Sequence, residues 1–229
     1  MFTGAYTALI TPFTRDGTVD YARLRELVEF QIAGGIDGLV PVGTTGESPT
    51  VDVAEHIEII RVVVQTAAGR VKVIAGSGAN ATAEALELTK MAMDAGADGT
   101  LQVTPYYNKP TQAGLIQHFT AVAELGLPVV LYNVPGRTSC EIAVPTVAEL
   151  SKHPKIVALK EAGGSVDRVS RVKAACNIEV LSGDDGLTLP MMSVGAGGVI
   201  SVASNVAPRA VADLVHAAAA GRWDEARKL

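Results

Sequence analysis

The sequence predicts an α/β protein of the (β/α)₈ TIM-barrel class, and two features carry this prediction. Short apolar runs alternate along the whole chain with amphipathic segments of helical spacing, which is typical of βα units that form a parallel sheet. A helix end, a glycine turn and a strand also follow one another in "AGGIDGLVPV", "AGADGTLQV" and "GAGGVISV". Gly38, Gly99 and Gly198 of these stretches are 61 and 99 residues apart, about two and three periods of a roughly 30-residue unit.

Eight apolar runs fit this period and are predicted to be strands. They are "YTALI" (6–10), "GLVPV" (38–42), "VKVIAG" (71–76), "TLQVTP" (100–105), "PVVLYN" (128–133), "IVALK" (156–160), "EVLSG" (179–183) and "GVISV" (198–202). Helices are predicted between them; in 21–33, for example, apolar residues recur on one face at helical spacing from Leu24 onward. Asp52 and Glu55 have the spacing of a capping box at the start of another helix.

An open, doubly wound sheet is the alternative fold. Such a sheet normally carries a GxGxxG turn after its first strand, and this chain has "TPFTRDG" there. The barrel is therefore favoured. No linker or low-complexity tract divides the sequence, so residues 1–229 are predicted to form one barrel domain.

The composition excludes several classes of function. The net charge is −5 and no basic run is present, which argues against a nucleic-acid partner. Cys140 and Cys176 stand in unrelated contexts without a CxxC motif, so no metal site is predicted. The N-terminal stretch "MFTGAYTALITPF" has no basic segment before a short apolar run. We therefore expect a cytoplasmic protein that has no membrane partner.

The sixth predicted strand ends in Lys160, where the active site of such a barrel is formed by the loops at the carboxyl ends of the strands. A lysine in an apolar pocket has a lowered pKa, and its neutral amine is a nucleophile that forms a Schiff base with a carbonyl. Two structural alternatives remain open from the residue alone. The side chain can extend to the barrel rim, or it can pair with Glu161.

Hydroxyl groups in neighbouring loops favour the catalytic interpretation. Thr44 in "GTTGES", Tyr107 in "PYYNKP" and Tyr132 in "YNVPGRT" can form a chain that transfers protons. The glycine-flanked N–H groups of the "GTTGES" turn can bind a small carboxylate, and Arg137 can bind a second one bidentately. Adjacent side chains of an extended backbone point in opposite directions, so Tyr106 and Tyr107 are expected to diverge, one of them toward a subunit contact.

The stretches "VGTTGES", "PYYNKP", "YNVPGRT", "KEA", "SGDD" and "GVISV", in this order, closely resemble the dihydrodipicolinate synthase family, also called 4-hydroxy-tetrahydrodipicolinate synthase. This family belongs to the pyruvate-dependent class I aldolases. The resemblance implies a homotetrameric TIM barrel, a dimer of dimers. It implies a lyase that condenses pyruvate with L-aspartate 4-semialdehyde in lysine and diaminopimelate biosynthesis, with no metal or organic cofactor.

The resemblance also implies roles for individual residues. Lys160 matches the Schiff-base lysine, and Tyr132 matches the proton-transfer residue of a relay with Thr44 and with Tyr107, which reaches the neighbouring subunit's site. The positions that match substrate-binding residues are Thr45, Arg137, Gly183 and Ile200. The positions that match a lysine-inhibition site in part are Ser48, His56, Asn80, Glu84 and Tyr106.

Two departures from the family pattern affect these expectations. Pro49 and Val53 stand where lysine-sensitive members often have a small residue and a histidine, which leaves feedback inhibition open. Family members also continue beyond a segment like "WDEARKL" into further helices, so the expected domain is the barrel without that extension.

Three other functions remain as alternatives. Another pyruvate aldolase, such as an N-acetylneuraminate lyase or a 2-keto-3-deoxy sugar acid aldolase, has neutral hydroxyl-binding groups in place of Arg137. A barrel that binds pyridoxal phosphate needs a phosphate cradle, for which Asp184 and Asp185 are poor neighbours. A non-catalytic barrel has no need of both a nucleophile and a proton relay.

Overall fold

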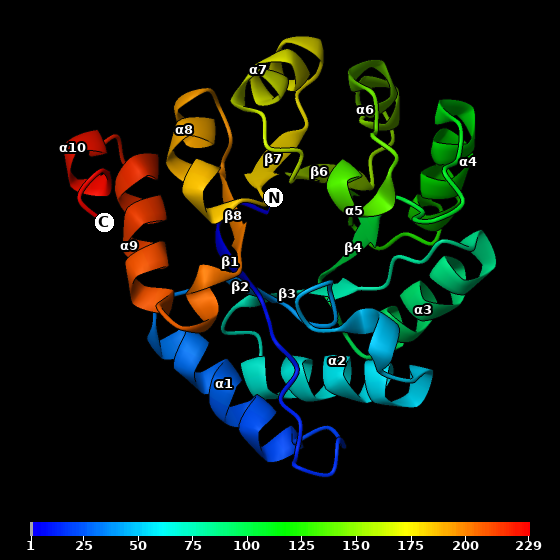
Figure 1. The fold of residues 1–229 in the computed structure, drawn as a ribbon, viewed down its shortest axis with the longest axis vertical. Coiled ribbons are helices and arrows are strands. Elements are labelled where there is room, and N and C mark those ends of the chain that lie inside the picture. Colours follow the sequence, from blue (N-terminus) through cyan, green and yellow to red (C-terminus); the bar gives the residue numbers. More distant parts are fainter. Residues whose placement is uncertain (1) are drawn as a thin grey trace.

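The computed structural model describes residues 2–229 and shows a closed barrel of eight parallel strands surrounded by helices (Figure 1). The strands follow one another around the barrel in chain order, and β1 closes it by pairing with β8. They are β1 Gly4–Ala8, β2 Gly38–Val40, β3 Lys72–Gly76, β4 Gly99–Val103, β5 Val129–Asn133, β6 Ile156–Glu161, β7 Glu179–Ser182 and β8 Gly198–Ser201. The predicted fold class is confirmed, and the open sheet is excluded.

All eight predicted strands are present, with limits that differ by a few residues. The predicted second strand ran to Val42, but β2 ends at Val40 because Pro41 has no N–H to donate to the ladder. Val42 then takes a left-handed conformation with φ of 51°, which is unusual for a β-branched residue and turns the chain toward the loop after β2. Its carbonyl oxygen comes so close to Gly76 that a Cβ there would lie 2.2 Å from it.

The helices lie outside the barrel (Figure 1). They are α1 Tyr21–Ala33, α2 Val53–Ala67, α3 Thr82–Asp94, α4 Gln112–Ala123, α5 Pro135–Thr138, α6 Val144–Leu150, α7 Val166–Ala175, α8 Thr188–Ser193, α9 Pro208–Ala219 and α10 Trp223–Ala226. The capping box of Asp52 and Glu55 is confirmed at the start of α2. Among residues 2–229, no helix combines the length and apolar character that crossing a membrane requires.

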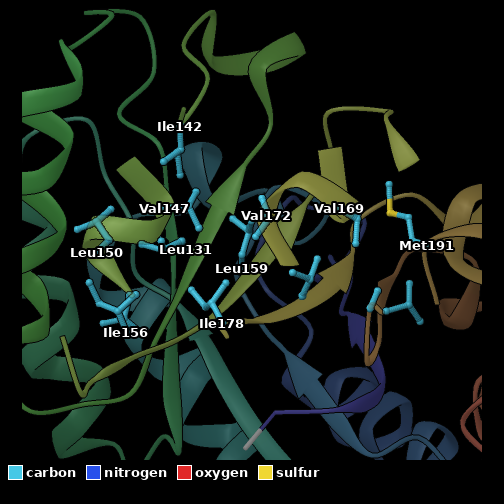
Figure 2. Packing of buried hydrophobic residues seen from close by; sticks show 14 of the residues in the cluster. Leu131, Ile142, Val147, Leu150, Ile156, Leu159, Val169, Val172, Ile178 and Met191 are labelled. Atoms are coloured by element: carbon cyan, nitrogen blue, oxygen red, sulfur yellow. The ribbon is translucent and has the colours of Figure 1, made fainter. Parts of the chain in front are cut away.

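Alternation along the strands divides the buried side chains into an inner and an outer set. Leu131 of β5 and Leu159 of β6 face outward and pack against Val147 of α6 and Val172 of α7 (Figure 2). The next residues along these strands belong to the inner set, because side chains of a strand point alternately to the two faces of the sheet. The inner residues of these two strands are Val130, Tyr132, Ala158 and Lys160.

Two glycines permit the closure of the barrel between its first and last strands. Gly4 of β1 is paired with Gly198 of β8. A Cβ on Gly198 would lie 1.9 Å from the carbonyl oxygen of Gly4, so no other residue fits at this approach. Gly198 also has a positive φ of 154°.

Candidate active site

Lys160 and Tyr132 are direct neighbours at the carboxyl end of the barrel interior. They are paired in the register of β5 and β6, so both side chains enter the same layer of the interior. The lysine Nζ lies 4.3 Å from the centre of the tyrosine ring. Both side chains are buried, with 5% exposure each. The two side chains are therefore held next to each other in the barrel interior.

Burial gives Lys160 the property that Schiff-base chemistry needs. It lowers the lysine pKa from 10.5 to about 8, because removal from water disfavours the charged ammonium. The negative charges of Asp185 and Asp184 oppose this decrease, and the positive charge of Arg137 adds to it. A substantial fraction of the amine is therefore neutral near pH 8.

Neither structural alternative for Lys160 fits the structure. A side chain that is 5% exposed does not extend to the rim. Glu161 points to the outer face of the barrel, where its carboxylate accepts a hydrogen bond from Arg168 Nε at 2.7 Å. Within the described residues, Lys160 forms no ion pair, and its amine is available to a ligand.

Burial favours the protonated phenol of Tyr132 over its anion. Burial raises the pKa of its phenol, and Asp184 acts in the same direction. The nearby Thr44 side chain and the charge of Arg137 oppose the increase. Thr44 and Tyr132 line the same cavity.

A cavity of about 180 Å³ opens beside Tyr132, and Lys160 itself is not among the residues that line it. Thr44, Tyr132 and Arg137 line it together with apolar side chains of β4 and of the segment after β5. Arg137 lies in α5 and forms no ion pair with any described residue, so its guanidinium is free for a ligand. The backbone N–H groups of Thr44 and Thr45 also have no hydrogen-bond acceptor within residues 2–229. The Thr45 side chain is half-buried and does not line the cavity.

Gly183 directly follows β7 and lies beside the lysine stem, and Ile200 belongs to β8. A Cβ on Gly183 would lie 3.1 Å from Lys160 Cε and 2.6 Å from Ala162 Cβ, so glycine leaves the space that the lysine stem occupies. Ile200 is fully buried in the barrel interior. Gly183 therefore lies next to the predicted nucleophile, and Ile200 belongs to the apolar interior of the barrel.

The chain matches a family model over residues 1–229, and the model is described as the Dihydrodipicolinate synthetase family. The chain belongs to this family. A 4-hydroxy-tetrahydrodipicolinate synthase from Geobacter sulfurreducens is 55% identical, with 100% of this chain and 80% of that protein covered. The family prediction is confirmed, and with it the prediction of an enzyme of the lyase class.

Solved structures of the dihydrodipicolinate synthetase family agree with this assignment. The 4-hydroxy-tetrahydrodipicolinate synthase from Methylacidiphilum fumariolicum has a TM-score of 0.98 and 52% identity, covering 100% of this chain and 77% of its own. The dihydrodipicolinate synthase from Acinetobacter baumannii, solved in complex with pyruvate, has a TM-score of 0.98 and 45% identity. That match covers 100% of this chain and 79% of the solved chain.

Within this chain, Tyr107 does not line the cavity that Thr44 and Tyr132 share. Its side chain is 89% exposed, whereas Tyr106 lines the cavity. The two tyrosines diverge as predicted, but the premise of an extended backbone is wrong. Tyr107 has a left-handed φ of 73°, and this turn sends its ring away from the cavity.

The residues that match the family's lysine site divide into two groups. Ser48 and Tyr106 line the same cavity as Thr44, and burial together with the charge of Glu84 raises the pKa of Tyr106. His56 is buried instead, and its Nε2 lies 2.7 Å from the Gly76 carbonyl oxygen. Asn80 is half-buried, and its carbonyl oxygen accepts a hydrogen bond from Asn108.

The sequence reasoning missed a structural role for several polar residues around the site. Asp185 accepts hydrogen bonds from the Val202 and Ala203 N–H groups at 3.1 and 3.0 Å, which joins the loops after β7 and β8. Asn133 and Glu161 form a second connection on the outer face, between β5 and β6. For Asn133 and Glu161 the one available signal was their position directly after strand residues that face the barrel interior.

Proposed function

We propose that this chain catalyses the condensation of pyruvate with L-aspartate 4-semialdehyde, the 4-hydroxy-tetrahydrodipicolinate synthase reaction, through a Schiff base on Lys160. The observation that carries this proposal is a buried lysine without an ion-pair partner, held 4.3 Å from the ring of Tyr132. Its lowered pKa of about 8 favours the neutral amine. The names of the similar proteins agree with this activity, which belongs to lysine and diaminopimelate biosynthesis.

The first half of the reaction uses the amine of Lys160. Neutral Nζ attacks the ketone carbon of pyruvate, and loss of water from the carbinolamine gives an imine. The free N–H groups of Thr44 and Thr45 bind the pyruvate carboxylate beside it. The imine nitrogen withdraws electrons, so the methyl group loses a proton and an enamine forms.

The second half uses Tyr132 and Arg137. Arg137 binds the carboxylate of the semialdehyde, and the enamine carbon attacks its aldehyde. The phenol of Tyr132, which burial keeps protonated, transfers a proton to the new alkoxide, and the Thr44 hydroxyl in the same cavity relays the replacement. The amine of the second substrate then displaces Lys160, which closes the ring and frees the enzyme.

The proposed proton relay of Thr44, Tyr132 and Tyr107 is complete only when a second copy of the chain is present. Tyr107 is 89% exposed and held away from its own cavity by a left-handed backbone, a conformation that costs on the order of 1 kcal/mol. We propose that Tyr107 enters the cavity of a neighbouring protomer in a homotetramer, a dimer of dimers. Sedimentation at several concentrations tests this assembly, and an active monomer would contradict it.

Inhibition by lysine is proposed for the region where Ser48, Glu84 and Tyr106 approach one another. The Glu84 carboxylate is exposed and suits the amine of a lysine ligand. His56 makes no contribution in this arrangement because it is buried against Gly76. Turnover measured against increasing lysine tests the proposal; a Glu84→Gln variant is expected to lose any inhibition without losing turnover.

Trapping with borohydride tests the proposed function directly. The chain is incubated with pyruvate and borohydride, and the reduced adduct is located by mass spectrometry. We expect one adduct, on Lys160, and turnover of aspartate semialdehyde by the untreated enzyme. An unmodified Lys160 contradicts the Schiff base. An adduct without turnover of the semialdehyde points instead to the sugar acid aldolases.

The selectivity of Arg137 separates these two activities further. Replacement with lysine keeps a positive charge but loses the two parallel hydrogen bonds to a carboxylate. Arg137→Lys is therefore expected to raise the KM for the semialdehyde by about tenfold, with little change in pyruvate binding. An unchanged KM for the semialdehyde would argue against a carboxylate clamp.

A further inference from the structure

Each of the two reacting side chains is followed in its strand by a buried polar residue on the opposite face of the barrel. Tyr132 is followed by Asn133 and Lys160 by Glu161, and the two followers are paired in register like the reacting residues themselves. Both are fully buried. Asn133 Nδ2 donates to the two carboxylate oxygens of Glu161 at 2.9 and 3.1 Å. A side-chain hydrogen bond thus joins β5 to β6 directly behind the site.

The carboxylate of Glu161 is held from two further directions. The N–H of Gly163 donates to it at 2.8 Å, and Arg168 Nε of α7 donates at 2.7 Å. The guanidinium of Arg168 also donates to the carbonyl oxygen of Ile142 and pairs with Glu141 at 2.9 Å. The buried negative charge is therefore compensated, and its orientation is fixed by three donors in all.

Asn133 extends this network to the segment that follows Arg137. Its Oδ1 accepts a hydrogen bond from the Ile142 N–H at 3.0 Å. Ile142 thus contacts both Asn133 and Arg168 through its two backbone polar groups. The network connects β5, β6, α7 and the segment after α5 into one unit; Lys160 and Tyr132 stand on its two strands, and Arg137 lies in the short helix that precedes the connected segment.

The location of this network is hard to explain by stability alone. A buried ion pair is often no more stabilising than apolar residues of similar volume. Two residues earlier, at Leu131 and Leu159, the outer face of the same two strands is apolar. Polar residues replace that pattern only where the inner face carries the reacting pair. A small shift of one strand against the other at this level moves Nζ of the lysine relative to the phenol.

We propose that Asn133, Glu161 and Arg168 are positioning residues, which hold Lys160 at the distance and angle from Tyr132 and Arg137 that proton transfer requires. This inference rests on the proposed function, because it assigns the network to the same Schiff-base site. None of the three residues touches the substrate. Their effect is on the steps that need two groups in the correct geometry, and less on attack by the lysine alone.

Asn133→Leu tests the inference, with Thr7→Val as the matched control. The leucine has a similar size but makes neither of the asparagine's hydrogen bonds. Thr7 is also buried, on β1, where its hydroxyl donates to Gln31 at 2.7 Å far from the reacting pair. Three quantities are measured on folded protein: the borohydride-trapped adduct, deuterium exchange of the pyruvate methyl group, and kcat.

For Asn133→Leu we expect nearly full adduct at saturating pyruvate, while methyl exchange and kcat fall about 100-fold, as a displacement near 1 Å can cause. Thr7→Val is expected to keep all three quantities within about threefold of the unmodified chain. A kcat for Asn133→Leu that stays within the same range overturns the inference. So does a loss of adduct in proportion to kcat, which indicates general damage to the fold.

If Asn133→Leu does not fold, a second test exchanges the amide of Asn133 and the carboxylate of Glu161 between the two positions. Asn133→Asp places two carboxylates in contact, and adding Glu161→Gln restores one donor and one acceptor across the strands. We expect the double variant to recover at least about tenfold in kcat over Asn133→Asp. No recovery overturns the inference. Failure of the proposed function is a different result, since the unmodified chain then forms no adduct on Lys160.

Discussion

The two ends of the barrel differ in whether their charged groups are paired within the chain. At the amino end, Asp37 accepts hydrogen bonds from the Ala5 N–H and from His216, each at 2.8 Å. Asp98 likewise pairs with Lys72 at 2.6 Å and accepts from the N–H of Val73 at 2.9 Å. These carboxylates bind the strands and helices of the chain to one another.

At the carboxyl end, the groups that line the interior remain without protein partners. Among the described residues, Lys160 and Arg137 form no ion pair, and the N–H groups of Thr44 and Thr45 have no acceptor. Of the paired groups there, Glu161 stands on the outer face behind the site, and Asp185 joins the loops after β7 and β8. The contrast indicates that the amino end serves stability and that the carboxyl end keeps its binding capacity for substrates.

The strongest test of this contrast removes the charge at the centre of the carboxyl end. Lys160→Met is expected to lower turnover at least about 1,000-fold, since the nucleophile is lost. The same change is expected to raise the free energy of unfolding at pH 7 by on the order of 3 kcal/mol, because the lowered lysine pKa of about 8 reports an unfavourable burial. Steady-state kinetics and urea unfolding measure both effects.

Lys72→Met is the matched control at the amino end, because this lysine is exposed and paired with Asp98. Its turnover should equal that of the unmodified chain. A Lys160→Met variant that is less stable than the unmodified chain would break the contrast between the two ends.

Tyr132→Phe removes the phenol while leaving the ring against Lys160. We expect turnover to fall by about 100- to 10,000-fold, the usual range for loss of a positioned proton donor. The affinity for pyruvate should change little, because the lysine and the free N–H groups remain. Kinetics with both substrates separate the two effects; an equal loss of turnover and pyruvate affinity would count against the role in proton transfer.

The pH dependence of adduct formation follows from the lowered pKa of Lys160, about 8. Below this value the amine is mostly protonated, so the trapping rate at pH 6 should be about 50-fold lower than at pH 8. Above it the rate should level off. A rate that continues to rise tenfold per pH unit to pH 10 would show an ordinary lysine.

Stability should depend on the same group in a higher pH window. The unfolded chain keeps the lysine proton up to about pH 10.5, whereas the folded chain loses it near 8. The unfolded state binds more protons between these values, so the stability contribution of Lys160 rises with pH there and is constant below 8. Lys160→Met should lack this rise in urea unfolding.

The smallest expected effects are at the amino end. Asp98→Ala leaves the N–H of Val73 without its acceptor and is expected to cost about 1–3 kcal/mol of unfolding free energy. The kcat of folded protein should not change, since the residue lies at the other end of the strands. Asp98→Asn keeps an acceptor for this N–H and should cost less than about 1 kcal/mol. Any loss of kcat in the alanine variant would show that the two ends are coupled.

Sequence patterns predicted the barrel because its order is local. Each βα unit shows an apolar run and an amphipathic helix, and the loops after the strands collect at one end whatever the exact strand limits are. For this reason the nearness of Lys160, Tyr132, Thr44 and Arg137 was predictable without coordinates. Strand ends were less so: Pro41 and the left-handed Val42 end β2 by backbone geometry that the apolar pattern does not show.

Sequence patterns could not predict which side chains pair with one another. Lys160 and Glu161 are adjacent and opposite in charge, yet strand alternation places them on different faces and gives the carboxylate to Arg168. The exposed position of Tyr107 likewise depends on one left-handed φ. Such features arise from contacts between distant segments, and the residue types alone allow several outcomes.

The close approach of Gly4 and Gly198 has a consequence for how the chain folds during synthesis. The first strand leaves the ribosome long before the last one, and until β8 arrives both β1 and β7 present unpaired edges. Joining segments so far apart in sequence is slow, since the entropy of the whole intervening chain opposes it. Until β8 pairs with β1, the growing chain is therefore an open sheet whose unpaired edges are exposed to aggregation. This is the interval in which a chaperone protects the chain most.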